Sequence, residues 1–212
     1  MNSVLMIFID GVGIGEKDYE FNPFFKYGFK IFDEIIKDTP HKQNQYLEKD
    51  GIFVFPTDVR LGVEGLPQSG TGQVSIFCGM NAPKFVGKHF GPFPYSTTIP
   101  IIAEQNIFKT YKELGKSAHF ANAYPKVFFE YIESGKKRLS VTSLSCMLSN
   151  VPLNGVTELR KGEALSAEID NDGWVNKLGY SLPIIKPETA AKRLFKIAAE
   201  NHFTLFEQFL TD

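Results

Sequence analysis

Apolar residues form an unbroken run at Val4–Ile9 (VLMIFI), directly before the polar, glycine-rich stretch DGVGIG. A short continuous run of β-branched and large apolar residues is typical of a parallel strand that is buried on both faces. Asp10 follows this run at once, so we expect it at the carboxyl end of the strand. Open α/β sheets bind their ligands at that end of the strands.

Helical and strand patterns alternate along much of the remaining chain. Helices are predicted around 29–37, from Ser69 onward, over 101–114 up to Gly115, and from Pro187, and strands at 52–55, 118–121 and 204–210. On the Pro187 helix, the predicted buried face is Ala191, Leu194, Ile197 and Ala198. This alternation predicts an α/β fold in which an open, mostly parallel sheet is flanked by helices.

The region 124–186 has no clear hydrophobic period and contains several turn-forming stretches such as NVPLNG and IDNDGW. We therefore expect three parts: an N-terminal α/β core at 1–123, an insertion over the sheet at 124–186, and a return to the core at 187–212.

Ser69 lies where the stretch LPQSGTGQ passes into a helical pattern, with Val74, Phe77 and Cys78 on one face. A serine at a helix N-terminus lies beside unpaired N–H groups and the positive end of the helix dipole, which attract phosphate and stabilise an alkoxide. With no histidine base close in the sequence, activation of this hydroxyl would need a metal ion. A plain N-cap role for Ser69 is the alternative.

The glycines that follow Asp10 do not complete a nucleotide-binding motif. Gly15 comes one residue too early for the dinucleotide fingerprint GxGxxG, and SGTGQ lacks the lysine of a phosphate-binding P-loop. A carboxylate at a strand end, followed by glycines that allow close approach, suits a metal ligand. Capping of the following turn is the alternative role for Asp10.

Composition narrows the class of protein. The chain has 212 residues, 43% hydrophobic and 22% charged, which is typical of a folded domain. A net charge of −1 gives no basic surface for nucleic acid, and no apolar stretch reaches the roughly 20 residues of a membrane helix. The N-terminus has no basic start typical of a signal peptide, so we expect a cytoplasmic protein. Among the four histidines, His89 in KHFGPFP is a candidate for contact with a phosphate or substrate.

Three stretches together, IFIDGVGIG, GVEGLPQSGTGQVSIFCGMNAPKFVGKHFGPFP and TLFEQFLTD, resemble the alkaline phosphatase superfamily. The similar branch contains cofactor-independent phosphoglycerate mutase, phosphopentomutase and bacterial metalloenzyme-domain proteins. The resemblance covers essentially the whole chain, and its strongest motif is 65–79, which has the order of the nucleophile segment.

The resemblance implies a two-metal phosphoryl-transfer site. Ser69 would be the nucleophile and a metal ligand, Asp10 would bind one metal, and Asp212 would be the first carboxylate of a second metal-binding cluster. Gly70 and Thr71 would shape the phosphate pocket. The implied cofactors are two divalent ions, manganese or zinc and alternatively magnesium. A phosphoserine intermediate would pass its phosphoryl group to water, as in a phosphatase, or back to the substrate, as in a phosphomutase.

The chain also departs from the family pattern. Gln73 stands where the mutases usually carry histidine, and the D…H pair, Asp-His-Gly motif and further histidine of the family do not follow Asp212. The sequence therefore predicts the N-terminal portion of such an enzyme, lacking the C-terminal strands and metal ligands, with an exposed sheet edge. Its expected partners are a small phosphorylated substrate and a complementing C-terminal polypeptide. The alternative is a non-catalytic, truncated remnant that binds phosphorylated ligands or a partner.

Overall fold

The computed structural model describes residues 2–136 and 138–209. The chain divides into two compact units, one formed by Met1–Asp10 and Arg60–Asp212 and the other by Gly11–Val59. The two units are described separately below.

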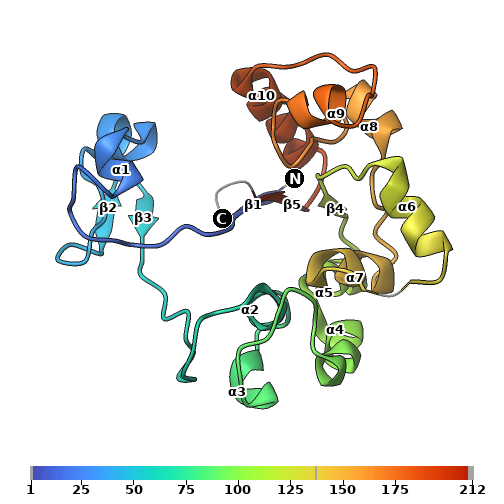
Figure 1. Cartoon of the computed structure of the whole chain (residues 1–212), viewed down its shortest axis with the longest axis horizontal. Helices are drawn as coiled ribbons and strands as arrows, with labels where there is room; N and C mark the ends of the chain where they lie inside the picture. Colours follow the sequence, from blue (N-terminus) through green and yellow to red (C-terminus); the bar gives the residue numbers. More distant parts are fainter. Residues whose placement is uncertain (1, 137, 210–212) are drawn as a thin grey trace. The chain divides into compact units, whose positions relative to one another are not determined.

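The first unit contains a parallel sheet of three strands, which Figure 1 shows in the order β1 (Val4–Ile9), β5 (Phe203–Gln208), β4 (Ala118–Phe120). Val4 and Ala118 both pair with Phe203, so the three strands begin at the same level. The predicted α/β class with a parallel sheet is thus confirmed. The strand predicted at 204–210 is β5, the central strand, and residues 210–212 lie outside the described part.

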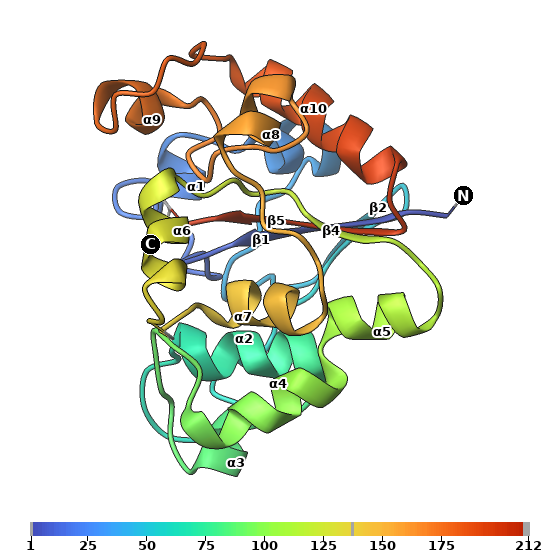
Figure 2. The ribbon, with the colours of Figure 1, turned by 90° about the vertical axis from the view of Figure 1, so that its right-hand side faces the viewer.

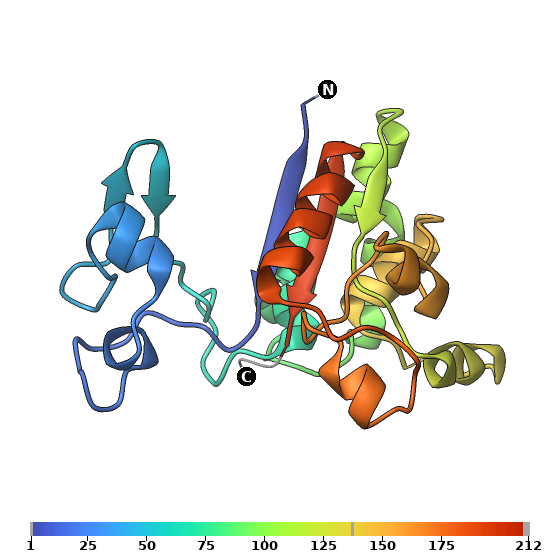
Figure 3. The same ribbon diagram turned by 90° about the horizontal axis from the view of Figure 1, so that it is seen from above.

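Helices cover both faces of this sheet (Figure 2). On one face, α2 (Ser69–Cys78), α4 (Ile99–Gln105), α5 (Ile107–Glu113) and α7 (Val141–Leu148) enclose the main core. On the other face, α10 (Pro187–Ala199) packs on β5, as Figure 3 also shows. Since strand side chains alternate in direction, Phe203 and Leu205 enter the main core while Phe206 meets α10.

The strand β1 has a neighbour on one side only among the described residues. Met6 and Phe8 pack on the main core, whereas Ile7 and Ile9 on the opposite face are about half exposed. Helix α10 lies over β5 and leaves part of this face of β1 uncovered. The described sheet therefore ends in an apolar edge strand that is partly exposed.

The stretches that connect these helices and strands are irregular or form short helices. α3 (Ala82–Val86) and a 3-10 turn (Ser96–Thr98) follow α2, and α6 (Lys126–Glu133), α8 (Val156–Lys161) and α9 (Asp172–Asn176) lie farther along the chain. Four helices, α6 to α9, thus fall within 124–186, where the hydrophobic pattern predicted none. Val141 and Cys146 of α7 belong to the main core. The division of the chain at 123 and 186 stays a prediction.

The single helix predicted over 101–114 is wrong, because the chain breaks between α4 and α5 at Asn106. This residue has an extended backbone (ψ 156°) and its side chain accepts a hydrogen bond from the N–H of Lys109, which caps α5. The same buried side chain donates to the carbonyl of Ile102 at 2.7 Å and to Ser149 Oγ at 2.9 Å. These bonds hold the two helices at a corner.

The predicted helix from Pro187 is confirmed, with Pro187 in its first turn. Leu194, Ile197 and Ala198 are buried as predicted. Ala191 is exposed and Ala190 is buried in its place. Both alanines fit the helical spacing of the buried face, and the rotation of α10 about its axis turns Ala190 toward the sheet.

The second unit, Gly11–Val59, has little regular structure. It contains α1 (Pro23–Lys26), a π-helical segment η1 (Ile31–Ile36) and an antiparallel hairpin of β2 (Leu47–Lys49) and β3 (Ile52–Val54). The helix predicted around 29–37 corresponds to η1, which ends at Lys37 in the left-handed region (φ 67°). The rings of Phe24 and Phe32 pack edge to face, with centroids 5.5 Å apart.

No described helix is long and apolar enough to cross a membrane.

Candidate functional site

Asp10 lies at the carboxyl edge of the parallel sheet. It follows β1 directly, and its N–H donates to the carbonyl of Gln208, the last residue of β5, at 3.0 Å. The carboxyl edge is where parallel α/β sheets bind ligands. The structure thus places Asp10 at the edge that the sequence predicts.

Helix α2 runs antiparallel to β5, and two contacts define this direction. Near the end of β5, Gln73 Nε2 donates to Glu207 Oε1 at 3.4 Å. One turn later on the helix, Phe77 contacts Phe108, whose ring packs on Phe203 at the start of β5. The N-terminus of α2 therefore points toward the carboxyl edge. Ser69 and Asp10 lie at the same edge of the sheet.

Ser69 is the first residue of α2, and the N-cap is Gln68, whose backbone is extended (φ −131°, ψ 141°) and whose side chain forms no capping bond. The plain N-cap role for Ser69 is therefore wrong. Among the described residues, the Ser69 hydroxyl makes no hydrogen bond, and the N–H groups of Ser69 and Gly70 find no acceptor. A helix N-terminus with unused N–H groups attracts anions.

The next residues fix the first turn of α2 against the loop 90–93. The N–H of Thr71 donates to the carbonyl of Phe90 at 2.8 Å, and the N–H of Phe90 donates back to Thr71 Oγ1 at 3.1 Å. A Cβ atom on Gly70 would lie 2.6 Å from the carbonyl oxygen of Phe90 and still closer to that of Phe93. Only glycine fits at position 70, and Thr71 anchors the turn with both its N–H and its hydroxyl.

A buried carboxyl group, Glu207, lies beneath the same edge. Glu207 follows Phe203 and Leu205 on the face of β5 that meets α2 and α7, and it is fully buried. Thr142 Oγ1 of α7 donates to its Oε1 at 2.5 Å, while its Oε2 makes no hydrogen bond with any described residue. Gln73 Oε1 is also buried, and no residue in the described part of the chain forms a hydrogen bond with it. Two unsatisfied acceptors in one cluster favour a proton on this carboxyl group.

The electrostatic surroundings agree with a protonated Glu207. Burial raises the pKa of Glu207 to about 7, and the negative charge of Asp10 adds to this rise, while the Thr142 hydrogen bond lowers it. The backbone at Glu207 is also held by Asn122, which follows β4. Asn122 Nδ2 donates to the carbonyl of Glu207 at 2.7 Å, and the N–H of Glu207 donates to Asn122 Oδ1 at 2.9 Å. Asn122 thus pairs with both backbone polar groups of Glu207 and connects the central strand to the end of β4.

The sequence pattern did not identify Glu207 as part of the site. In the sequence, Glu207 is the one charged residue of the strand FTLFEQ. It continues the alternate, core-facing positions of Phe203 and Leu205. A charge at a core-facing strand position needs a partner or a proton, and this physical rule could have singled it out.

His89 does not join this cluster through any bond in the described structure. Its Nε2 lies 3.1 Å from the carbonyl oxygen of Val63, a geometry in which Nε2–H donates. Its ring also lies near Gly65. The role of His89 toward a substrate stays a prediction, and Asp212 lies outside the described residues.

The described residues offer only part of a metal site. They contain no group of three or more histidine, cysteine, aspartate or glutamate side chains that could hold an ion. The donors at the carboxyl edge, Asp10 and Ser69, are oxygens, which suit a hard cation such as Mg²⁺ or Mn²⁺. Cys78 is a poor ligand, because burial raises the pKa of its thiol to about 11. The described residues do not supply the full ligand set of two metals.

Comparison with known proteins finds no matching family model, and no curated protein or solved structure matches the chain. Membership of the alkaline phosphatase superfamily therefore stays a prediction from the sequence motifs.

Proposed function

We propose that this chain is the serine-bearing portion of a two-metal phosphoryl-transfer enzyme, a phosphatase or phosphomutase, with Ser69 as the nucleophile. One observation carries the proposal. At the carboxyl edge of the sheet, the first turn of α2 presents a Ser69 hydroxyl beside the N–H groups of Ser69 and Gly70, and none of these groups makes a hydrogen bond within residues 2–136 and 138–209. This arrangement offers a nucleophile and anion-binding donors at one point.

The chemistry would proceed in two steps. Ser69 Oγ forms a bond to phosphorus while the bond from phosphorus to the substrate oxygen breaks. The serine proton passes to a base, and the departing oxygen takes up a proton. In the second step, water or a second substrate hydroxyl attacks the phosphoserine, its proton leaves, and the Ser69 hydroxyl is restored.

The residues of the first turn would stabilise the charge on the transferred group. The N–H groups of Ser69 and Gly70 would donate to phosphoryl oxygens, and the positive end of the α2 dipole would add to this attraction. Because Gly70 and Thr71 fix the turn to the loop 90–93, these donors need little reorganisation when the substrate binds.

The two divalent ions that the resemblance implies would lower the pKa of the Ser69 hydroxyl and neutralise phosphoryl charge. Asp10 and Ser69 would be ligands from this chain, and the resemblance implies Asp212 as a further ligand. Since the described residues supply an incomplete ligand set, the roles proposed for this chain are limited to nucleophile, donors and partial ligation.

The test is the turnover of a general phosphomonoester, p-nitrophenyl phosphate, by the full chain with Mn²⁺, Zn²⁺ or Mg²⁺. Measurable turnover that Ser69→Ala abolishes would support the proposal. Ser75→Ala is the matched control, because Ser75 lies on the same helix with its hydroxyl bonded to the carbonyl of Thr71 at 3.0 Å. Turnover that survives Ser69→Ala would reject Ser69 as the nucleophile.

The alternative, a phosphate-ligand-binding protein without turnover, predicts a different result. Calorimetry would then show binding of a phosphate ester to the full chain, unchanged by added metal and without product. If neither binding nor turnover is found with any of the three ions, the chain by itself has neither function, and the phosphoryl-transfer role would then require a complementing polypeptide.

A further inference from the structure

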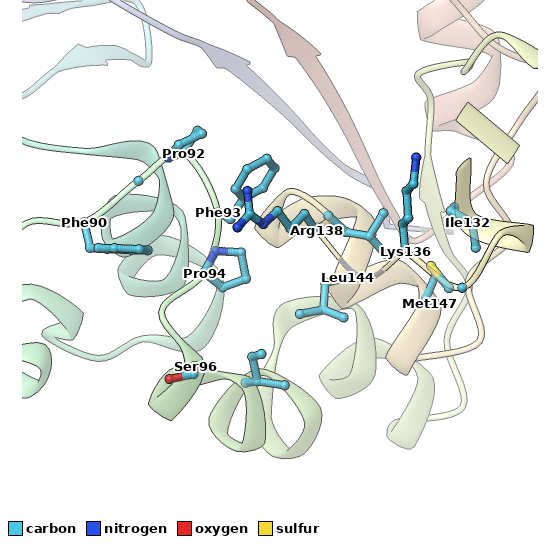
Figure 4. Close-up of a pocket in the computed structure, with 14 residues that line it drawn as sticks. Phe90, Pro92, Phe93, Pro94, Ser96, Ile132, Lys136, Arg138, Leu144 and Met147 are labelled. Carbon is cyan, nitrogen blue, oxygen red and sulfur yellow. The ribbon is translucent and has the colours of Figure 1, made fainter. Parts of the chain in front are cut away.

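A cavity of about 780 Å³ lies between the loop 90–99 and the region of α6 and α7, separate from the Ser69 hydroxyl (Figure 4). Its walls are mainly apolar and include Phe90, Phe93, Ile132, Leu139, Leu144 and Met147. This volume lies within the range of small-molecule binding sites, roughly 300–1,000 Å³.

Two cationic side chains enter the lining from the segment that joins α6 to α7. Lys136 and Arg138 make no ion pair with any other described residue. In Figure 4 the Arg138 side chain extends across the cavity toward Phe93, while Lys136 points away from Leu144 and Met147. The cavity thus combines an apolar interior with positive charge that has no counter-ion in the described chain.

We propose that this cavity binds a small amphiphilic anion, with one negative head group on a short apolar chain. The planar guanidinium of Arg138 would hold the head group through paired hydrogen bonds, with Lys136 as a second charge at the rim. The apolar chain would lie against Phe93, Leu144 and Met147, where its transfer from water is favourable. A neutral ligand would gain only from burial of its apolar chain and not from the pairing of a charged head group with Arg138.

The cavity and the Ser69 turn share one wall, the loop 90–93. On one side this loop lines the cavity, and on the other the carbonyl groups of Phe90 and Phe93 lie against Gly70. The anion site nevertheless uses its own charged and apolar residues. It would therefore exist whether or not Ser69 reacts.

The test is calorimetric titration of the full chain with three ligands of one chain length: octanoate, octanol and octyltrimethylammonium. We expect octanoate to bind at one site, with an affinity about tenfold or more above that of octanol, since a charge-assisted pair contributes on the order of 1.5–3 kcal/mol. The cationic ligand should bind more weakly still. Equal affinity for the three ligands, or no saturable octanoate binding, would overturn the proposal.

Two variants locate the site. Arg138→Gln should weaken octanoate binding by about tenfold and leave octanol binding unchanged, whereas Arg160→Gln on α8 should alter neither. Met147→Trp, at a partly exposed position, should fill the apolar end and weaken both ligands. Thermal unfolding of each variant verifies folding. Octanoate affinity that is unchanged in both Arg138→Gln and Met147→Trp would contradict this location.

Discussion

Gln73 and Glu207 lie 134 positions apart in the sequence, and their side chains meet in the core, with Gln73 Nε2 3.4 Å from Glu207 Oε1. The contact joins α2 to the central strand one helical turn below Ser69. Each of the two side chains also has a buried oxygen, Gln73 Oε1 and Glu207 Oε2, that forms no hydrogen bond with any described residue. The helix that carries the proposed nucleophile is therefore linked to a buried carboxyl group, and the protonation of this group changes the free energy of unfolding.

The first prediction concerns the pH dependence that Glu207 gives to stability. Its pKa rises from 4.5 to about 7 on folding, so the folded state favours the protonated carboxyl group. The contribution of the protonated Glu207 to the free energy of unfolding is fully present below pH 4.5 and is lost as the pH rises toward 7. The free energy of unfolding should therefore fall by about 3 kcal/mol between pH 4.5 and pH 8 through this group. Urea denaturation at several pH values measures it.

Glu207→Gln should remove most of that decline, because the amide is neutral at every pH tested. An exposed carboxyl group, Glu200→Gln, serves as the control and should leave the decline in place. If wild type and Glu207→Gln lose stability in parallel as the pH rises, the assignment to Glu207 is wrong.

The second prediction compares two buried threonines. Thr142→Val removes the hydroxyl that donates to Glu207 Oε1, so it should lower the free energy of unfolding at pH 8 by about 1–3 kcal/mol. Thr204→Val removes a buried hydroxyl that has no partner among the described residues, so its effect should be near zero or stabilising. Chemical denaturation of both variants at pH 8 provides the comparison. A larger loss in Thr204→Val than in Thr142→Val would contradict these roles.

The third prediction concerns the first turn of α2. Gly70→Ala places a methyl group against the carbonyl groups of Phe90 and Phe93, which should cost about 1–3 kcal/mol of stability or displace the loop. Gly72→Ala, two residues later, meets no atom within 4 Å and should gain about 0.5–1 kcal/mol. Thermal unfolding of the two variants should shift in opposite directions. A tolerated Gly70→Ala would mean that the loop does not press on this turn.

The fourth prediction tests the corner between α4 and α5. Asn106→Ala removes the cap on α5 and leaves the buried Ser149 hydroxyl without its partner, so it should cost about 2–4 kcal/mol. Asn176→Ala, at an exposed position, should cost less than about 0.5 kcal/mol. Denaturant unfolding of the two variants gives both values, and similar losses would show that the Asn106 network contributes little.

The sequence predicts the parts of the fold that local pattern determines. Hydrophobic spacing, together with glycine and proline residues at element boundaries, predicts three elements. These are the strand β1, the start of α2 at Ser69 and the helix from Pro187. Their common edge also follows, because a parallel α/β sheet places both the end of β1 with Asp10 and the N-terminus of the following helix at its carboxyl edge.

The remaining features depend on contacts between distant positions. The break at Asn106 requires Ser149, 43 positions away, while the apolar residues on either side continue a helical period. The role of Glu207 depends on Gln73 and Thr142, from two other helices. The cavity near Arg138 arises only when the loop 90–99 folds beside α7. No local pattern encodes such pairs.

The most direct test of the phosphoryl-transfer account is capture of the phosphorylated protein. The full chain would be mixed with p-nitrophenyl phosphate and Mn²⁺, quenched in acid, digested and analysed by mass spectrometry. We predict one added phosphoryl group on the peptide that contains Ser69, present in Ser75→Ala and absent in Ser69→Ala. Turnover without any phosphopeptide in the quenched wild type, or a phosphoryl group that persists on that peptide in Ser69→Ala, would contradict the account.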